Sequence, residues 1–269
     1  MTTILNKIEL TGKGLMKNRD CEVLIMPSNE GKIRLFIENS LEPVELCADN
    51  VVATNHCVVI GEKRKKLMLT EHLTAACAFC GIDSLDIHFS KSEVPILDGS
   101  SKEWVRLFKE AGIEKRKRKF YTVSEPVYYL NGKTHLVILP DKELSISYGV
   151  NYDHPDLTKR WVSFDRKNVD EIIEARTFGF LKDLKKFQLF GFAKGVTYEN
   201  TVGLDGDGYT TELRSEFEPA KHKMLDLIGD LYLTGYNPLD FKAQIIVKEA
   251  GHAVHVIVAK MLKDKIIEA

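Results

Sequence analysis

The stretch Pro219-Ala-Lys-His222-Lys-Met-Leu-Asp226-Leu-Ile-Gly-Asp230-Leu-Tyr-Leu233 has the pattern of a strong helix. Residues four apart on a helix lie about 40° from one another, so His222, Asp226 and Asp230 form one polar ridge. Apolar side chains cover much of the remaining helix surface. A polar ridge on an otherwise apolar helix needs polar partners from elsewhere in the fold.

Strand and helix patterns flank this stretch on both sides. The first part of the chain predicts strands at residues 7–10, 21–26, 32–37, 57–60 and 85–89, and helices at 70–81 and 101–111. The second part predicts strands at 121–123, 136–139, 144–148, 161–164 and 241–247, with a final helix from His252 onward. Residues 171–204 are rich in phenylalanine and glycine and are interpreted as a loop-like insert, which serves as core filler or as a channel wall.

The charged run at residues 114–119 contains no apolar side chain and is the best candidate for a domain boundary. We therefore predict an N-terminal α+β domain at 1–117 and a C-terminal α+β domain at 118–269 that carries the insert. Both halves end in the order helix, strand, helix. This order suggests an old duplication with a site at the joint, although α+β domains also end this way by chance.

Bulk composition excludes several classes of protein. A net charge of -1 over 269 residues argues against a field that attracts nucleic acid. No stretch approaches the roughly 18 apolar residues of a membrane span, and the N-terminus lacks the apolar core of a signal peptide. Of the five cysteines, Cys77 and Cys80 form one Cys-x-x-Cys pair, but without a second pair they cannot complete a tetrahedral zinc site. We expect a cytoplasmic protein with reduced thiols.

The polar ridge has the spacing of a metal site. A histidine and an aspartate at i and i+4, such as His222 and Asp226, can converge on one ion, and an N,O donor set suits Zn²⁺. A third ligand is offered by His72, at the start of the helix predicted in the other domain. Glu71 leaves that helix about 100° away, which favours a base beside a metal-bound water over a ligand.

Other interpretations of the same residues remain open at this point. A lone His-x-x-x-Asp on a helix is more often a surface ion pair or a capped core histidine. A further histidine, His252, follows Gly251 at the start of the last predicted helix and strengthens the catalytic interpretation. The residues alone leave both a metal hydrolase and a structural ion pair possible.

Several sequence blocks carry a resemblance to a known family. They are Thr70-Glu-His-Leu73, Glu93-Val-Pro-Ile-Leu-Asp-Gly-Ser100, Ala175-Arg-Thr-Phe-Gly-Phe-Leu-Lys-Asp183 and His222-Lys-Met-Leu-Asp-Leu-Ile-Gly-Asp-Leu-Tyr-Leu233, followed by Gly251-His252. Through these blocks and their order along the sequence, the chain resembles the UDP-3-O-acyl-N-acetylglucosamine deacetylases, which act in lipid A biosynthesis. The resemblance covers nearly the whole chain.

The resemblance implies a role for each matching residue. It implies Zn²⁺ ligands at His72, His222 and Asp226, with Glu71 as the catalytic base. It also implies that His252, held by Asp230, is the general acid, and that Thr177 donates to the oxyanion. The substrate contacts that it implies are Lys223 at the diphosphate, Asp183 near the uridine, Phe178 and Phe180 along the acyl chain, and Lys194.

The fold and partners expected from the resemblance are equally specific. It implies an α+β fold of two similar domains, each a sheet packed on two helices, with the helices sandwiched between the sheets and the metal at the interface. The expected partner is a small acylated UDP-sugar. We expect no nucleic acid, no stable membrane insertion and a monomer.

Three departures from the family pattern leave the substrate open. They lie at Met16, Val196 and Ser215, away from the expected metal ligands and base. The alternatives are a deacetylase of another N-acylated sugar or nucleotide sugar, and a non-catalytic paralogue that binds zinc and an acylated sugar. The presence of Glu71, His252 and Asp230 counts against the paralogue, because a binding protein needs neither an acid nor a base.

Overall fold

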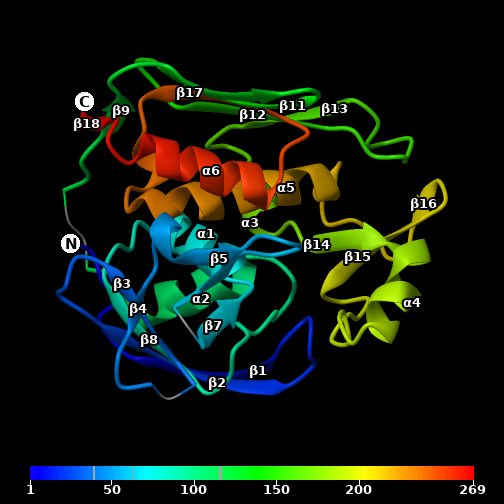
Figure 1. The fold of residues 1–269 in the computed structure, drawn as a ribbon, viewed down its shortest axis with the longest axis horizontal. Helices are drawn as coiled ribbons and strands as arrows, with labels where there is room; N and C mark the ends of the chain where they lie inside the picture. The colour runs from blue at the N-terminus through cyan, green and yellow to red at the C-terminus, as the bar shows by residue number, and fades with distance from the viewer. Residues whose placement is uncertain (39, 63, 115–116) are drawn as a thin grey trace.

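The computed structural model describes residues 1–38, 40–62, 64–114 and 117–269. Two five-stranded sheets form the outer layers, and helices fill the space between them (Figure 1). This is the α+β arrangement expected from the sequence. The boundary between residues 117 and 118 stays a prediction, because residues 115–116 of the charged run lie outside the described residues.

The first sheet is built from the N-terminal part of the chain. Its strand order is β1 (Ile8–Lys13), β2 (Asp20–Pro27), β8 (Leu85–Phe89), β3 (Ile33–Ile37) and β4 (Val44–Glu45). The central strand β8 pairs antiparallel with β2 and parallel with β3. Buried and more exposed residues alternate along β2, β3 and β8, as they do in a sheet with one face on the core.

The second sheet repeats this topology. Its order is β10 (Val127–Asn131), β11 (Thr134–Pro140), β17 (Ala243–Lys248), β12 (Ser145–Val150) and β13 (Arg160–Phe164). The central strand β17 pairs antiparallel with β11 and parallel with β12, as β8 does in the first sheet. The shared order and strand directions agree with the two similar units expected from the sequence.

Four helices form the inner layers. On the side of the first sheet, α1 (Glu71–Cys80) contacts α2 (Lys102–Ala111); on the side of the second, α5 (Glu218–Leu231) contacts α6 (His252–Leu262). The two layers meet where α1 packs against α5 (Figure 1). Every residue of α5 is buried, so its polar ridge has to find partners on the neighbouring helices.

Smaller elements complete the fold. A three-stranded sheet of residues 51–53, 59–62 and 65–68 contacts β3 and β4 of the first sheet, and residues 121–123 pair with the C-terminal strand at 266–268. The bounds are β5 (Val51–Ala53), β6 (Val59–Glu62), β7 (Lys65–Met68), β9 (Tyr121–Val123), β18 (Ile266–Glu268) and the short 3₁₀ turns η1 (Ala48–Asn50), η2 (Tyr232–Thr234) and η3 (Pro238–Asp240). Nowhere in the described ranges is there a helix with the length and apolarity to cross a bilayer.

The segment at 171–204 differs from the loop predicted for it. It contains or overlaps α3 (Val169–Ile173), β14 (Thr177–Phe180), α4 (Leu181–Leu189) and β15 (Thr201–Asp205), and β16 (Gly208–Tyr209) follows it. Strand β14 pairs in parallel with β15, so that Thr177 lies opposite Thr201. The prediction was wrong because such a pairing is made between residues distant in sequence and leaves no local alternation to detect.

Gly229 sets how closely the two helical layers approach. A Cβ atom at this position would lie 2.2 Å from the carbonyl oxygen of Glu71 and 2.9 Å from Oγ1 of Thr74. The first distance is far below van der Waals contact and involves backbone, which cannot swing aside. Only glycine therefore lets α5 and α1 pack at this distance.

We predict that Gly229→Ala lowers the free energy of unfolding by about 1–3 kcal/mol, because overpacking outweighs the roughly 1 kcal/mol that alanine gains over glycine in a helix. Urea unfolding followed by circular dichroism measures the change. The matched control is Gly208→Ala, where the nearest atom to an added Cβ is 3.7 Å away. A stabilised Gly229→Ala protein would contradict this account of the helix contact.

Candidate metal centre

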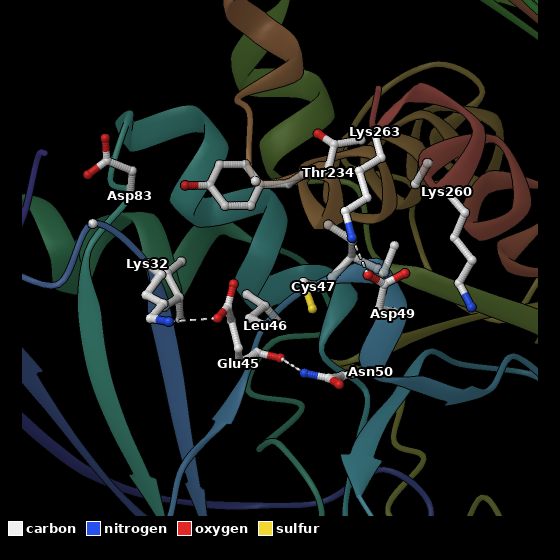
Figure 2. A pocket seen from close by; sticks show the side chains of 17 residues that line it. Lys32, Glu45, Leu46, Cys47, Asp49, Asn50, Asp83, Thr234, Lys260 and Lys263 are labelled. Atoms are coloured by element: carbon white, nitrogen blue, oxygen red, sulfur yellow. Dashed lines mark hydrogen bonds and ion pairs between the residues drawn. The ribbon is translucent and has the colours of Figure 1, made fainter. Parts of the chain in front are cut away.

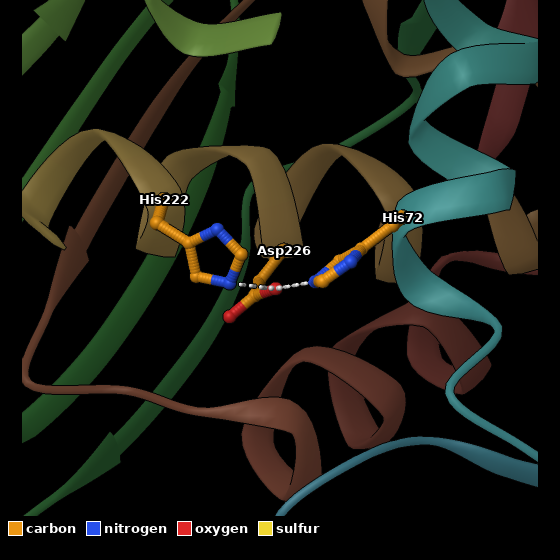
Figure 3. A group of neighbouring side chains, drawn as sticks. All are labelled: His72, His222 and Asp226. Carbon is orange, nitrogen blue, oxygen red and sulfur yellow. Dashed lines mark ion pairs between the residues drawn. The ribbon is translucent and has the colours of Figure 1, made fainter. Parts of the chain in front are cut away.

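Two histidines and an aspartate converge between the helical layers. His72 comes from α1, while His222 and Asp226 come from α5, and one donor atom of each lies within 4.8 Å of the others (Figure 3). The Nε2 atoms of His222 and His72 lie 3.4 Å and 3.9 Å from Oδ1 of Asp226. The structure thus brings together the three residues that the sequence analysis grouped as metal ligands.

The orientation of His222 leaves a lone pair for a metal. Its Nδ1 lies 2.9 Å from the carbonyl oxygen of Ala175, and this contact requires the proton on Nδ1. Nε2 is then unprotonated and faces the cluster. Burial lowers the pKa of His222, and burial together with the charge of His222 lowers the pKa of His72 to about 3. Both imidazoles are therefore neutral at pH 7, as metal ligands must be.

Asp226 supplies the negative charge of the cluster. Burial alone would raise its pKa, but the charges of Lys223 and His222 lower it overall, so the carboxylate stays ionised. Its Oδ1 is buried and has no hydrogen-bond partner among the described residues. A buried carboxylate oxygen without a donor, facing the acceptor nitrogen of His222, fits a cation, and this N,N,O donor set suits Zn²⁺.

Glu71 lies beside the cluster without joining it. Its Oε1 is 3.8 Å from Nε2 of His252, and its Oε2 accepts a hydrogen bond from the backbone N–H of Val58 at 3.2 Å. Burial raises the pKa of Glu71 to about 7, even though the charge of His252 opposes the rise. A carboxylate with this pKa can both accept and release a proton near neutral pH.

His252 lies next to Glu71 and is paired with Asp230. The distance from Nδ1 to Oδ2 of Asp230 is 2.7 Å, and Nε2 lies 3.8 Å from Oδ2 of Asp226. Burial alone would lower the pKa of His252, but the carboxylates of Asp230 and Asp226 raise it to about 9. His252 is therefore a cation at pH 7.

The sequence analysis missed a second imidazole on Asp230. Nδ1 of His255 lies 2.8 Å from Oδ2 of Asp230, and its Nε2 lies 3.1 Å from the hydroxyl of Tyr148. That hydroxyl donates to the carbonyl oxygen of Ala250 at 2.8 Å. The signal was present as the spacing of His252 and His255, which puts both on the face of α6 that meets α5.

An apolar cavity of about 730 Å³ adjoins the cluster. Thr177, Phe178 and Phe180 line it, and the ring of Phe178 lies 6.1 Å from that of His222, centroid to centroid. The cavity is also lined by Met16 and Val196, two of the three departures from the family pattern. The phenylalanines of β14 are therefore cavity wall, one of the two possibilities raised for the insert.

The other residues predicted to contact the substrate lie outside the lining of the apolar cavity. The Lys223 ammonium pairs with Oδ2 of Asp226 at 2.6 Å, one helical turn away. Asp183 lies on α4 and Lys194 follows that helix, and neither is among the described residues that line the apolar cavity. Ser215 is the third departure; its hydroxyl is buried and lacks a hydrogen-bond partner within the described part of the chain.

A second cavity, of about 410 Å³, contains none of the residues predicted for the site (Figure 2). It lies where η1 and the β3–β4 region approach η2 and α6. Two ion pairs lie in it: Lys32 donates to Glu45 at 2.9 Å, and Lys263 donates to Asp49. No histidine is among the described residues that line it, so it offers no counterpart to the cluster of histidines and carboxylates.

A buried ion pair fixes the segment that carries Ala175 and Thr177. Nε and Nη2 of Arg176 donate to the two carboxylate oxygens of Glu218, at 2.9 and 3.1 Å, and the backbone N–H groups of Arg176 and Arg214 also donate to this carboxylate. Glu218 is the first residue of α5 and its side chain is fully buried. The pair therefore holds the Ala175 carbonyl, the partner of His222, against the start of α5.

The fold and the cluster define an α+β protein with two like sheets and a candidate metal centre buried between their helices. The chain belongs to the UDP-3-O-acyl N-acetylglycosamine deacetylase (LpxC) family, whose model matches residues 1–264. A UDP-3-O-acyl-N-acetylglucosamine deacetylase of Trichormus variabilis is 32% identical over 274 residues, covering 97% of each chain. One of Leptospira biflexa is 33% identical, covering 98% of this chain and 90% of its own. A third, of Idiomarina loihiensis, is 34% identical, with 94% and 86% covered.

We predict that Glu218→Gln lowers the free energy of unfolding at pH 7 by about 3–5 kcal/mol, because it leaves the Arg176 charge buried and unpaired. Burial raises the pKa of Glu218, but the hydrogen bonds from Arg176 and Arg214 lower it overall, below its ordinary value. The contribution of the Glu218 carboxylate to the free energy of unfolding is therefore complete above its pKa in the unfolded chain, about 4.3. It is lost as the pH falls through the pKa of Glu218 in the folded protein.

Urea unfolding of both proteins between pH 8 and pH 4 measures this contribution. The difference between them should stay constant down to about pH 5 and shrink below it. The control is Glu174→Gln, which breaks a pair with Lys102 in which the two side chains are 38% and 47% exposed, and it should cost less than about 1 kcal/mol. A difference that grows on acidification would be incompatible with a depressed pKa at Glu218.

Proposed function

We propose that this chain catalyses the zinc-dependent hydrolysis of the N-acetyl group of UDP-3-O-acyl-N-acetylglucosamine, releasing acetate, as a step of lipid A biosynthesis. The observation that carries the proposal is the convergence of His72, His222 and Asp226 beside Glu71 and His252, in a member of this deacetylase family. We further propose that the protein acts as a monomer in the cytoplasm.

The proposed ligands of Zn²⁺ are His72, His222 and Asp226. Bound there, the ion would polarise the amide carbonyl and lower the pKa of a water molecule. The neutral imidazoles and the ionised Asp226 carboxylate are in the protonation states that binding requires.

Glu71 is the proposed general base. Its pKa of about 7 is set chiefly by burial, so a large fraction is ionised at neutral pH and can take a proton from the attacking water. The hydrogen bond from the Val58 N–H to Oε2 fixes the carboxylate and leaves Oε1 facing the cluster.

His252 is the proposed general acid. Asp230 holds its Nδ1–H, so the proton on Nε2 points towards Glu71 and Asp226, where the amide would lie. The cation stabilises the negative charge of the developing oxyanion and then protonates the departing nitrogen. Thr177, at the edge of the apolar cavity, is the proposed donor to the same oxyanion.

The apolar cavity is the proposed site of the fatty acyl chain, with Phe178 and Phe180 in its wall. For the nucleotide we propose Lys223 at the diphosphate, Asp183 near the uridine, and Lys194. Because Met16 and Val196 line the cavity, a related N-acylated sugar with a different acyl group is the second candidate substrate. A non-catalytic role is less well supported, since it gives no function to the paired His252 and Asp230.

Acetate release from UDP-3-O-acyl-N-acetylglucosamine by the zinc-loaded protein tests the proposal. A series of acyl chain lengths, compared by kcat/KM, identifies the chain that the cavity accepts. Acetate release from a simpler N-acetyl sugar, but not from the UDP-sugar, would show that the substrate is another N-acylated sugar, the second candidate. Tight binding of the UDP-sugar without any acetate release would favour the non-catalytic paralogue.

We predict that Glu71→Gln binds zinc normally and lowers kcat by about 10²- to 10⁴-fold, the range typical of a general base. Zinc content by atomic absorption and acetate release are measured on the same preparation. His72→Ala is the matched comparison on the neighbouring residue, and it should lose zinc as well as activity. A His72→Ala protein that keeps both its metal and its activity would refute the proposed ligand set.

A further inference from the structure

Large apolar side chains are exposed at the tip of the insert. Leu189 ends α4 and is 83% exposed, and Phe190 and Phe192, which follow it, are 67% and 42% exposed. Figure 1 shows α4 at one end of the molecule, beside the two sheets and away from the helices between them. Apolar side chains exposed together in this way mark an interaction surface.

Lysines surround these side chains. Residues 181–194 contain four lysines and one aspartate, a net charge of +3, whereas the whole chain carries -1. Lys182, Lys185 and Lys186 are exposed on α4. From the N-terminal domain, the Lys17 ammonium lies 4.4 Å from the centre of the Phe192 ring. The tip therefore combines apolar contact area with a local excess of positive charge.

The two faces of α4 are used differently. Leu181, Leu184 and Phe187 follow one another at spacings of three and line the apolar cavity. Lys185, Lys186 and Leu189 are not among the described cavity-lining residues, and all three are exposed. The outer face of α4 is thus separate from the apolar cavity and open to solvent.

We propose that this basic tip, residues 181–194 together with Lys17, docks the protein peripherally on a bilayer that contains anionic phospholipid. Leu189 and Phe190 would enter the headgroup boundary while the lysines meet the anionic headgroups, the combination by which amphipathic segments bind membrane surfaces. Charge complementarity selects this partner. A second copy of the same tip would bring like charges together, which disfavours a symmetric dimer through this surface.

Docking in this orientation would bring the cavity towards the lipid, because Phe187, Phe190 and Phe192 are part of both the tip and the cavity wall. This consequence rests on the proposed function: an acylated sugar could pass between cavity and bilayer with little of its chain exposed to water. The docking itself does not depend on that function.

Co-sedimentation of the full-length protein with vesicles tests the docking. We expect binding to vesicles of phosphatidylcholine and phosphatidylglycerol at 3:1, binding at least about tenfold weaker to phosphatidylcholine alone, and weakening with added salt. The triple variant Lys185→Glu, Lys186→Glu, Leu189→Asp should lose at least about tenfold of the binding to anionic vesicles. Its acetate release from dissolved substrate should be unchanged, because none of the three residues is placed in the site or the cavity wall.

The matched control makes the same charge change elsewhere on the surface, as Lys133→Glu, Lys142→Glu, Leu41→Asp, where Leu41 is 95% exposed. It should bind anionic vesicles as the wild type does. The proposal is overturned if the wild type ignores anionic vesicles, if the tip variant binds like the wild type, or if the control loses as much binding. It is also overturned if sedimentation velocity shows the tip joining two copies of the chain in place of vesicle binding. None of these outcomes depends on whether the protein releases acetate.

Discussion

Two carboxylates of α5, Asp226 and Asp230, are ionised in a helix that is buried on all sides. Much of the surrounding structure supplies partners for these two buried charges. A buried charge is tolerated only when it is paired and hydrogen-bonded. Asp226 meets the Lys223 ammonium and two imidazoles, and Asp230 accepts from two further imidazoles on α6. The cationic His252 compensates the charge of Asp230. The pair that makes this buried carboxylate tolerable therefore also places a proton donor at the cluster.

The same constraint explains why the site lies at the joint between the two units. α5 provides two of the proposed ligands, but the third, His72, comes from α1 in the other layer, and Gly229 permits the close approach that brings it there. The Arg176–Glu218 pair fixes the opposite end of the arrangement, where the Ala175 carbonyl selects the tautomer of His222. Neither unit alone holds the complete cluster, so the geometry of the cluster depends on how the helical layers pack.

The sequence predicted what local periodicity encodes and missed what distant contacts create. The polar ridge and His72 as its partner follow from helical spacing and recognisable blocks. Four strands of each five-stranded sheet were also predicted, whereas the edge strands β4 and β10 were not. The parallel pairing of Thr177 with Thr201 did not, since the partners lie in segments without alternation. The contact of His255 with Asp230 was also missed, because its spacing from His252 does not reveal which carboxylate the helix will meet. Lys223 pairs with Asp226 at i, i+3 on α5, a contact that helical spacing permits but that the sequence analysis did not predict.

The proposed catalysis requires a buried carboxylate, whereas entry of the proposed substrate requires an accessible apolar surface. The two features lie in separate regions of the fold. Raising the pKa of Glu71 to about 7 requires burial, which the packing of α1 against α5 provides. The proposed acylated substrate instead requires an accessible apolar wall, which comes largely from the insert, where no residue of α4 is buried. Strand β14 joins the two regions, because Thr177 and Phe178 border the cavity while the Phe178 ring approaches His222. Because Met16 and Val196 line the cavity, differences there can change the shape of the proposed acyl site while the packing of α1 against α5 around Glu71 stays intact.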